Sequence, residues 1–228
     1  MIKARPFNFP YDGHFDPRST ALVIVDMQED FLGTEGYFAR KGYDPAPLRA
    51  ILPNVATLAD TARAAGCHII WTRQGYRADL ADLSAYERWR AERSGIYYQA
   101  RTAISCMRGH PGFEIVSDLT PDPADFIVDK TANGAFYQTD LDIILRSQKI
   151  THLLFTGCTT DVCVHTTLRE ANDRKFQCLL VEDACASGDR YAHDAAVHMV
   201  TVEDGIFGTV AKTEDVLISL RALAPDRG

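Results

Sequence analysis

The 228-residue sequence lacks the features that mark membrane-spanning, secreted and nucleic-acid-binding proteins. No run approaches the roughly 20 apolar residues of a membrane-spanning helix, and residues 1–13 contain no apolar signal-peptide core. Basic residues are in deficit: 24 Lys and Arg against 31 Asp and Glu give a net charge of −7. This charge argues against nucleic acid or an anionic membrane as a partner. We expect a cytoplasmic protein.

The cysteines also lack the spacing of a metal or disulfide framework. None of the six belongs to a C-x-x-C pair, and no Cys/His cluster has zinc-finger spacing. In a chain of this length without a secretory signal, free thiols are expected. The question is therefore whether one of them acts as a nucleophile.

The apolar pattern predicts an α/β fold with a doubly wound, mostly parallel sheet between two helical layers. Apolar runs of strand length recur at 21–25, 68–72, 125–128, 152–156 and 177–181. Segments with helical spacing lie between or after them, at 48–65, 141–148, 162–174 and 191–202. We expect residues 1–228 to form a single domain.

One arginine-rich segment, residues 73–110, interrupts this alternation. It has seven arginines against four acids, a balance of +3 in an acidic chain. It is either an inserted helix with a solvated loop, or a lid or subunit contact that carries positive charge and aromatics towards a pocket. The aromatics in question are Tyr76, Trp89, Tyr97 and Tyr98.

Three chemically useful side chains follow predicted strands. Asp26 follows the first strand and Lys130 the third, while Cys163 lies where the fourth strand leads into a helix. Because ligands bind at the carboxyl ends of parallel strands, an acid, an amine and a thiol meet at one edge. Taken singly, Asp26 also fits a turn, Lys130 fits the surface, and Cys163 fits a small buried apolar position.

Together the three side chains fit nucleophilic catalysis. The helix start and the ammonium are expected to lower the pKa of the Cys163 thiol. Asp26 would take the thiol proton, and Lys130 would hold the carboxylate. Backbone N–H groups between Gly157 and Asp161 would face a developing oxyanion.

The surrounding motifs resemble the isochorismatase-like cysteine hydrolases. The matching stretches are Ala-Leu-Val-Ile-Val-Asp26-Met-Gln-Glu-Asp-Phe, the strand end Asp129-Lys130, and Thr-Gly-Cys-Thr-Thr-Asp-Val-Cys163-Val. They occur in the family's order, and the resemblance covers about residues 17–210. It implies a catalytic triad of Asp26, Lys130 and Cys163, in which Cys163 forms a thioester with an amide carbonyl.

The same resemblance implies further site features. The backbone N–H groups of Thr159 and Cys163 would form the oxyanion hole, and the Cys158–Thr159 peptide would be cis. Isochorismatases proper do not need the thiol, so Cys163 argues against vinyl-ether cleavage. Nicotinamidases hold a metal through an Asp-x-His motif after the second strand, where this chain reads Trp-Thr-Arg-Gln-Gly-Tyr. We therefore expect no metal and no cofactor.

Within that family the sequence is most similar to biuret hydrolases, which implies a terminal C–N bond of a small linear ureide as the target. Two positions depart from their pattern: Asn133 replaces a lysine, and Glu203 (or Asp204 in a shifted register) replaces a glutamine. Both are expected to bind substrate. Because Asn and Glu change the available hydrogen-bond donors, triuret is slightly preferred over biuret.

Other interpretations remain open. A ureidoacrylate or N-carbamoyl amino acid amidohydrolase is the rival activity, ranked second because Glu203 would repel a carboxylate. An inactive binding or assembly module is the non-enzymatic alternative. Phe31, Phe136 and Tyr137 are expected either to wall the pocket or to serve as core, and His165, His193 and His198 to have no catalytic role. The resemblance also implies a homo-oligomer, a dimer or tetramer.

Overall fold

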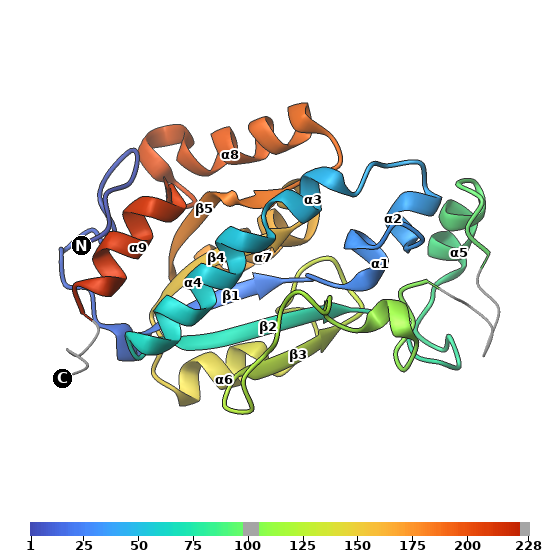
Figure 1. Ribbon diagram of the computed structural model, residues 1–228, viewed down its shortest axis with the longest axis horizontal. Coiled ribbons are helices and arrows are strands. Elements are labelled where there is room, and N and C mark those ends of the chain that lie inside the picture. Colours follow the sequence, from blue (N-terminus) through green and yellow to red (C-terminus); the bar gives the residue numbers. More distant parts are fainter. Residues whose placement is uncertain (98–104, 224–228) are drawn as a thin grey trace.

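The molecule is built on one parallel sheet that lies between two layers of helices (Figure 1). The computed structural model describes residues 1–97 and 105–223. Within them, six strands pair in the order β3-β2-β1-β4-β5-β6. Their bounds are β1 Thr20–Val25, β2 His68–Gln74, β3 Phe126–Lys130, β4 His152–Cys158, β5 Gln177–Ala186 and β6 Thr209–Ala211. This architecture confirms the predicted α/β fold.

Strand β1 shows why the sheet needs cover on both faces. All six of its residues are buried. Leu22 and Ile24 belong to the apolar cluster on one face of the sheet. Ala21, Val23 and Val25 belong to the cluster on the other. The near-continuous apolar run in the sequence follows from this double burial.

The helices divide between the two faces and one end of the sheet. Packed on one face are α3 (Ala46–Ala50), α4 (Leu52–Ala64) and α9 (Thr213–Arg221). On the other are α6 (Leu141–Ser147), α7 (His165–Asp173) and α8 (Arg190–Gly205). Beyond the carboxyl ends of the strands lie α1 (Glu29–Leu32), α2 (Tyr37–Arg40) and α5 (Ala85–Glu92), on the opposite side of the molecule from both termini (Figure 1).

Three elements differ from the sequence-based expectation. The helix expected over 48–65 is divided into α3 and α4, because Pro53 has no N–H to continue the hydrogen-bond ladder. The three-residue strand β6 was not expected. The helix expected over 162–174 begins instead with a π-type turn, η3 (Thr160–Val164), before α7.

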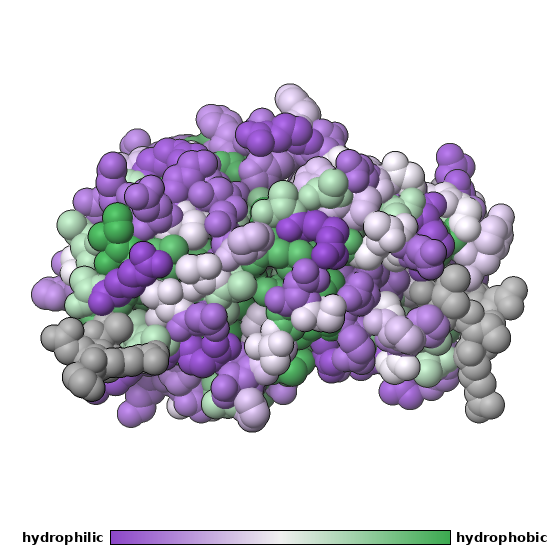
Figure 2. All heavy atoms as spheres, viewed as in Figure 1, coloured by the Kyte–Doolittle hydropathy of each residue, from purple (hydrophilic) through white to green (hydrophobic). Residues whose placement is uncertain are grey.

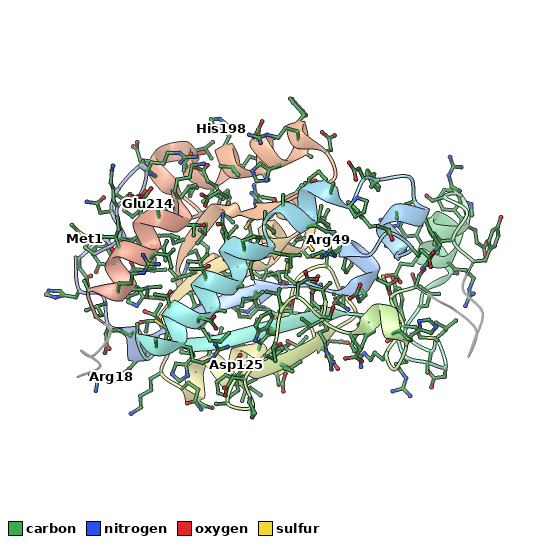
Figure 3. All side chains as sticks on the ribbon, viewed as in Figure 1. Met1, Arg18, Arg49, Asp125, His198 and Glu214 are labelled. Atoms are coloured by element: carbon green, nitrogen blue, oxygen red, sulfur yellow. The ribbon has the colours of Figure 1, made fainter. Side chains whose placement is uncertain are left out.

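A buried carboxylate fastens β3 to its neighbours. Asp125, at the start of β3 (Figure 3), accepts a hydrogen bond of 2.9 Å from Trp71 Nε1. It also forms an ion pair of 2.7 Å with Arg63 of α4. These contacts fix the strand whose far end carries Lys130.

The visible surface is mostly polar. The face shown in Figure 2 is dominated by hydrophilic residues with smaller apolar areas between them. Within residues 1–97 and 105–223, no helix combines the length and the apolar character needed to cross a membrane.

Candidate active site

The candidate site lies where the order of the strands reverses. From β1 the chain builds outward to β2 and β3, then returns to place β4 on the other side of β1. The loops after β1 and β4 therefore diverge and leave a crevice at the carboxyl edge of the sheet. Asp26 follows β1, and Cys163 lies in η3 after β4. Both side chains are buried.

A buried ion pair forms the base of the site. Lys130 Nζ lies 2.8 Å from Asp26 Oδ2, and both side chains are 0% exposed. The ammonium also donates to Gln74 Oε1 at 2.7 Å and to the carbonyl of Ala132 at 3.1 Å. Thr72 Oγ1 donates to the other oxygen of Asp26 at 2.6 Å. Each charge thus has an opposite charge and neutral partners, as a buried pair requires.

The Cys163 thiol lies close enough to both members of this pair for each of them to affect its pKa. The structure therefore brings together the acid, the amine and the thiol that the sequence singles out. Burial tends to lower the pKa of Lys130, but Asp26 and Cys163 outweigh it, so that this pKa is raised. Lys130 remains a cation at neutral pH.

The expected effect on the thiol was wrong in direction. Burial raises the pKa of Cys163 to about 12, although Lys130 acts to lower it. The start of a helix and a nearby ammonium do not outweigh the cost of a buried thiolate. The resting nucleophile is a neutral thiol, which needs a base within reach.

Gln74 is a site residue that the sequence reasoning missed. Its side chain bonds Lys130 and also donates to the carbonyl of Thr131 at 3.0 Å. Its backbone N–H donates to Gln28 Oε1 at 2.7 Å, which ties the end of β2 to the turn after β1. Gln74 ends β2, whereas the predicted strand stopped two residues earlier, at residue 72, so its predicted end did not indicate Gln74.

The turn after β4 shapes the loop that carries the thiol. The Cys158–Thr159 peptide is cis, as the family resemblance implied. The carbonyl of Thr159 accepts hydrogen bonds of 3.2 Å from the N–H groups of Val162 and Val164. Thr167 Oγ1 donates to the carbonyl of Cys163 at 2.6 Å. These bonds fix the backbone on both sides of the thiol, and the N–H groups of Thr159 and Cys163 stay a predicted pair of oxyanion donors.

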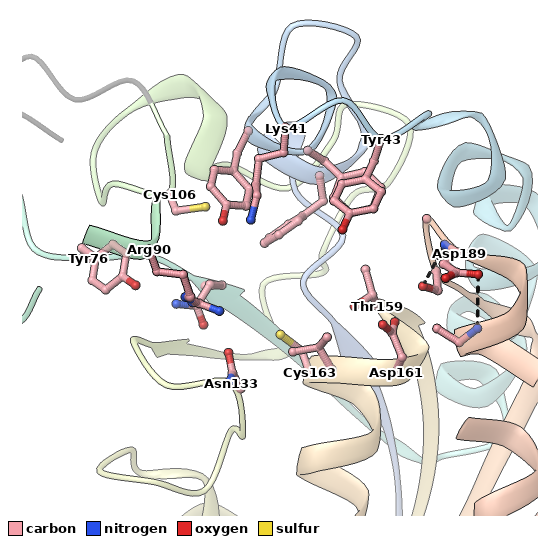
Figure 4. Close-up of a pocket in the computed structure, with 18 residues that line it drawn as sticks. Lys41, Tyr43, Tyr76, Arg90, Cys106, Asn133, Thr159, Asp161, Cys163 and Asp189 are labelled. Atoms are coloured by element: carbon pink, nitrogen blue, oxygen red, sulfur yellow. Dashed lines mark hydrogen bonds between the residues drawn. The ribbon is translucent and has the colours of Figure 1, made fainter. Parts of the chain in front are cut away.

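A cavity of about 370 Å³ opens over the thiol (Figure 4). Phe31 and Asn133 line it, as expected, together with Thr159 and Cys163. The cavity is also lined by several side chains for which sequence patterns predicted no individual role: Tyr37, Lys41, Gln74, Arg90, Cys106, Asp161 and Asp189. Lys41 and Arg90 come from α2 and α5, which the sheet order alone does not place.

Two expected substrate-binding residues do not line the cavity. Helix α8 is kinked at 202–204, where Glu203 and Asp204 have positive φ, and Glu203 is exposed there. Phe136 is buried in the core, 6.1 Å from the ring of Phe176. Tyr137 is 59% exposed. The prediction that Glu203 and Phe136 contact substrate is thus not supported by their positions in this chain.

The histidines also stand apart from the thiol. His165 is buried and accepts a hydrogen bond of 3.1 Å from Arg169. His193 Nδ1 lies 2.8 Å from Thr160 Oγ1 and thereby braces η3 from α8. Across the described residues, no group of three or more His, Cys, Asp or Glu side chains is placed to hold a metal ion. Tyr98 and Arg101 of the arginine-rich segment lie outside the described residues.

Comparisons with known proteins agree with this geometry. Residues 20–215 match the isochorismatase domain family. A cysteine hydrolase from Pseudomonas syringae pv. phaseolicola 1448A is 25% identical over 92% of this chain and 95% of its own, with a TM-score of 0.78. An isochorismatase family protein from Burkholderia thailandensis is 26% identical over 91% and 97%, with a TM-score of 0.71.

A third structure shares the fold. The N-carbamoylsarcosine amidase from Thermoplasma acidophilum is 24% identical over 86% of this chain and 97% of its own, with a TM-score of 0.66. The matched residues include Asp26, Lys130 and Cys163. The chain belongs to the isochorismatase-like cysteine hydrolase family.

Proposed function

We propose that this protein is a cysteine amidohydrolase that cleaves the terminal C–N bond of a ureido group and releases ammonia. The observation that carries the proposal is the buried Asp26–Lys130 pair beside the Cys163 thiol. A base and a cation held 2.8 Å apart next to a protonated nucleophile are what thiol activation requires.

In the first step, Cys163 Sγ attacks the terminal carbonyl of H₂N–CO–NH–R while Asp26 accepts the thiol proton. Because the pKa of Cys163 is about 12, attack and proton transfer are coupled, and no free thiolate accumulates. Asp26 then returns the proton to the departing amine, so that ammonia leaves and the thioester Cys163–S–CO–NH–R forms. Lys130 keeps its positive charge throughout.

In the second step, water attacks the thioester carbonyl and gives one proton to Asp26. The C–S bond breaks, and the thiolate takes that proton back. The released product HOOC–NH–R is a carbamic acid, which loses CO₂ to leave H₂N–R. In both steps the N–H groups of Thr159 and Cys163 would stabilise the oxyanion.

The identity of R is the finer part of the proposal. Similarity to biuret hydrolases makes biuret and triuret the first neutral candidates, and Asn133 in the cavity can both donate to and accept from a ureide. Ureidoacrylate and N-carbamoyl amino acids are the second candidates. The position of Glu203 favours them, because its exposed carboxylate does not line the cavity and cannot repel an acidic substrate there.

The test is ammonia release from biuret, triuret, ureidoacrylate, N-carbamoylsarcosine and nicotinamide. Turnover of at least one ureide is expected, with loss of activity in Cys163→Ser and Asp26→Asn. Absence of Cys163-dependent ammonia release from every substrate would reject the proposed function and favour a binding or assembly role.

A further inference from the structure

Two cations, Lys41 and Arg90, line one side of the cavity. Lys41 follows α2 and Arg90 lies on α5. Figure 4 shows both side chains extending into the cavity from the side that carries Tyr76 and Cys106. Within residues 1–97 and 105–223, neither of them forms an ion pair with a carboxylate. Lys41 Nζ lies over the ring of Tyr37, 5.3 Å from its centroid.

Two other arginines of the same segment do form ion pairs with carboxylates. Arg73 pairs with Asp129 at 2.8 Å and with Glu114 at 3.1 Å. Arg77 pairs with Asp79 at 2.8 Å. Arg90 acts on the charge of Glu87, on the same helix, but forms no ion pair with it in the described part of the chain, and its side chain lines the cavity.

The local fold holds α5, and with it Arg90, against the site. Ser84 and Glu87 form a capping box at the start of α5. The Tyr76 hydroxyl, from the chain just after β2, donates to Glu87 at 3.1 Å. The same helix is thereby capped and fastened to the edge of the site.

The two cations also act on each other. Burial, and after it the charge of Arg90, lowers the pKa of Lys41. Two like charges in a partly desolvated wall oppose each other, and an anion bound between them would relieve this repulsion. An anionic group of a substrate, bound between Lys41 and Arg90, would therefore be stabilised by both of them.

The opposite wall carries the reverse charge. Figure 4 shows Asp161 and Asp189 across the cavity, with Cys163 between them and Arg90. Asp189 caps α8, where it accepts a hydrogen bond of 2.8 Å from the N–H of Tyr191. A substrate carboxylate is repelled by this wall and attracted to the other, so the charges orient a substrate that has one acidic end.

We propose that Lys41 and Arg90 form a carboxylate-binding subsite, and that the substrate is a ureido acid, with R carrying a carboxylate. This inference rests on the proposed function. The carboxylate would lie between the two cations, and the ureido carbonyl over Cys163. The amide N–H groups would point to the side of Asp161. The cavity of about 370 Å³ is within the range of small-molecule sites.

The test compares kcat and KM for ureidoacrylate and an N-carbamoyl amino acid with those for biuret, in Arg90→Gln and Lys41→Gln. Each substitution is expected to raise KM for the acids by about 10- to 100-fold, the range for a charge-assisted hydrogen bond. KM for biuret, which has no carboxylate, should rise much less than KM for the acids. The control is Arg93→Gln, at the C-cap of the same helix, where the guanidinium lies over the ring of Trp89 and outside the cavity lining.

Several outcomes overturn the inference while leaving the proposed function in place. One is a wild-type enzyme that hydrolyses biuret or triuret but no ureido acid. Another is an equal loss for neutral and acidic substrates in Arg90→Gln.

If the wild-type enzyme hydrolyses none of the substrates, a binding measurement shows whether the carboxylate-binding subsite fails together with the proposed function. Calorimetry on the Cys163→Ala protein would give the dissociation constant of an N-carbamoyl amino acid with and without Arg90→Gln. Binding that weakens with this substitution, and with added salt, would support the subsite independently of catalysis. A dissociation constant that changes neither with Arg90→Gln nor with added salt would reject the subsite.

Discussion

The buried ion pair at the base of the site makes a quantitative prediction about stability. Lys130→Met leaves Asp26 buried beside two neutral groups, the Thr72 hydroxyl and the Cys163 thiol, and no cation. Asp26→Asn leaves the Lys130 ammonium buried with two neutral acceptors, Gln74 and the carbonyl of Ala132. Each single substitution therefore strands one charge in a site that is 0% exposed, at a cost of about 3–5 kcal/mol in the free energy of unfolding.

The double variant distinguishes this account from simple loss of contacts. With Asp26→Asn and Lys130→Met together no charge remains buried, so the double variant should be more stable than either single one. The assay is urea unfolding of all four proteins at one protein concentration, followed by circular dichroism. The reasoning is refuted if the two single losses add up in the double variant, because additivity means that the two side chains do not interact.

Two further predictions concern the thiol and the turn before it. With a pKa of about 12, Cys163 should react slowly with iodoacetamide at pH 7, and the rate should rise about tenfold for each pH unit above pH 7. Peptide mass mapping follows the reaction at this residue. A rate that levels off below pH 9 would contradict the raised pKa. Gly157 has φ +105°, and a Cβ there would lie 2.2 Å from the carbonyl oxygen of Val25. Gly157→Ala should therefore prevent folding or lower the free energy of unfolding by more than about 4 kcal/mol. Gly66, with φ +89° and open space around it, is the control, and Gly66→Ala should lower that free energy by only about 1–2 kcal/mol. Equal losses of stability in thermal unfolding would contradict the close packing of β4 on β1.

Sequence patterns predicted the sheet and the residues at its edge for a simple physical reason. Parallel strands are apolar on both faces and end at one side of the sheet, so a strand such as 21–25 and the Asp26 after it can be placed by periodicity and the switch-point rule. Lys130 and Cys163 follow from the same rule. Strand β6 was not predicted, because its three residues are too few to show a strand-like apolar pattern.

The rest of the cavity depends on tertiary packing that periodicity does not encode. Lys41 and Arg90 belong to short helices whose approach to the site is set by contacts such as that of Tyr76 with Glu87. Glu203 lies on a backbone kink that helical spacing cannot show. The pKa of Cys163 depends on how deeply the thiol is buried, which outweighs the charges that the sequence reveals.

The most direct test of the central claim is detection of the thioester at Cys163. The enzyme is mixed with a ureide that it turns over, the reaction is quenched in acid, and the intact mass of the protein is recorded. The mass should show an adduct of –CO–NH–R that maps to Cys163. One ammonia per active site should form before steady state. Cys163→Ser should show neither the adduct nor turnover. An enzyme that hydrolyses the ureide with no adduct, and keeps its activity in Cys163→Ser, would contradict the proposed mechanism.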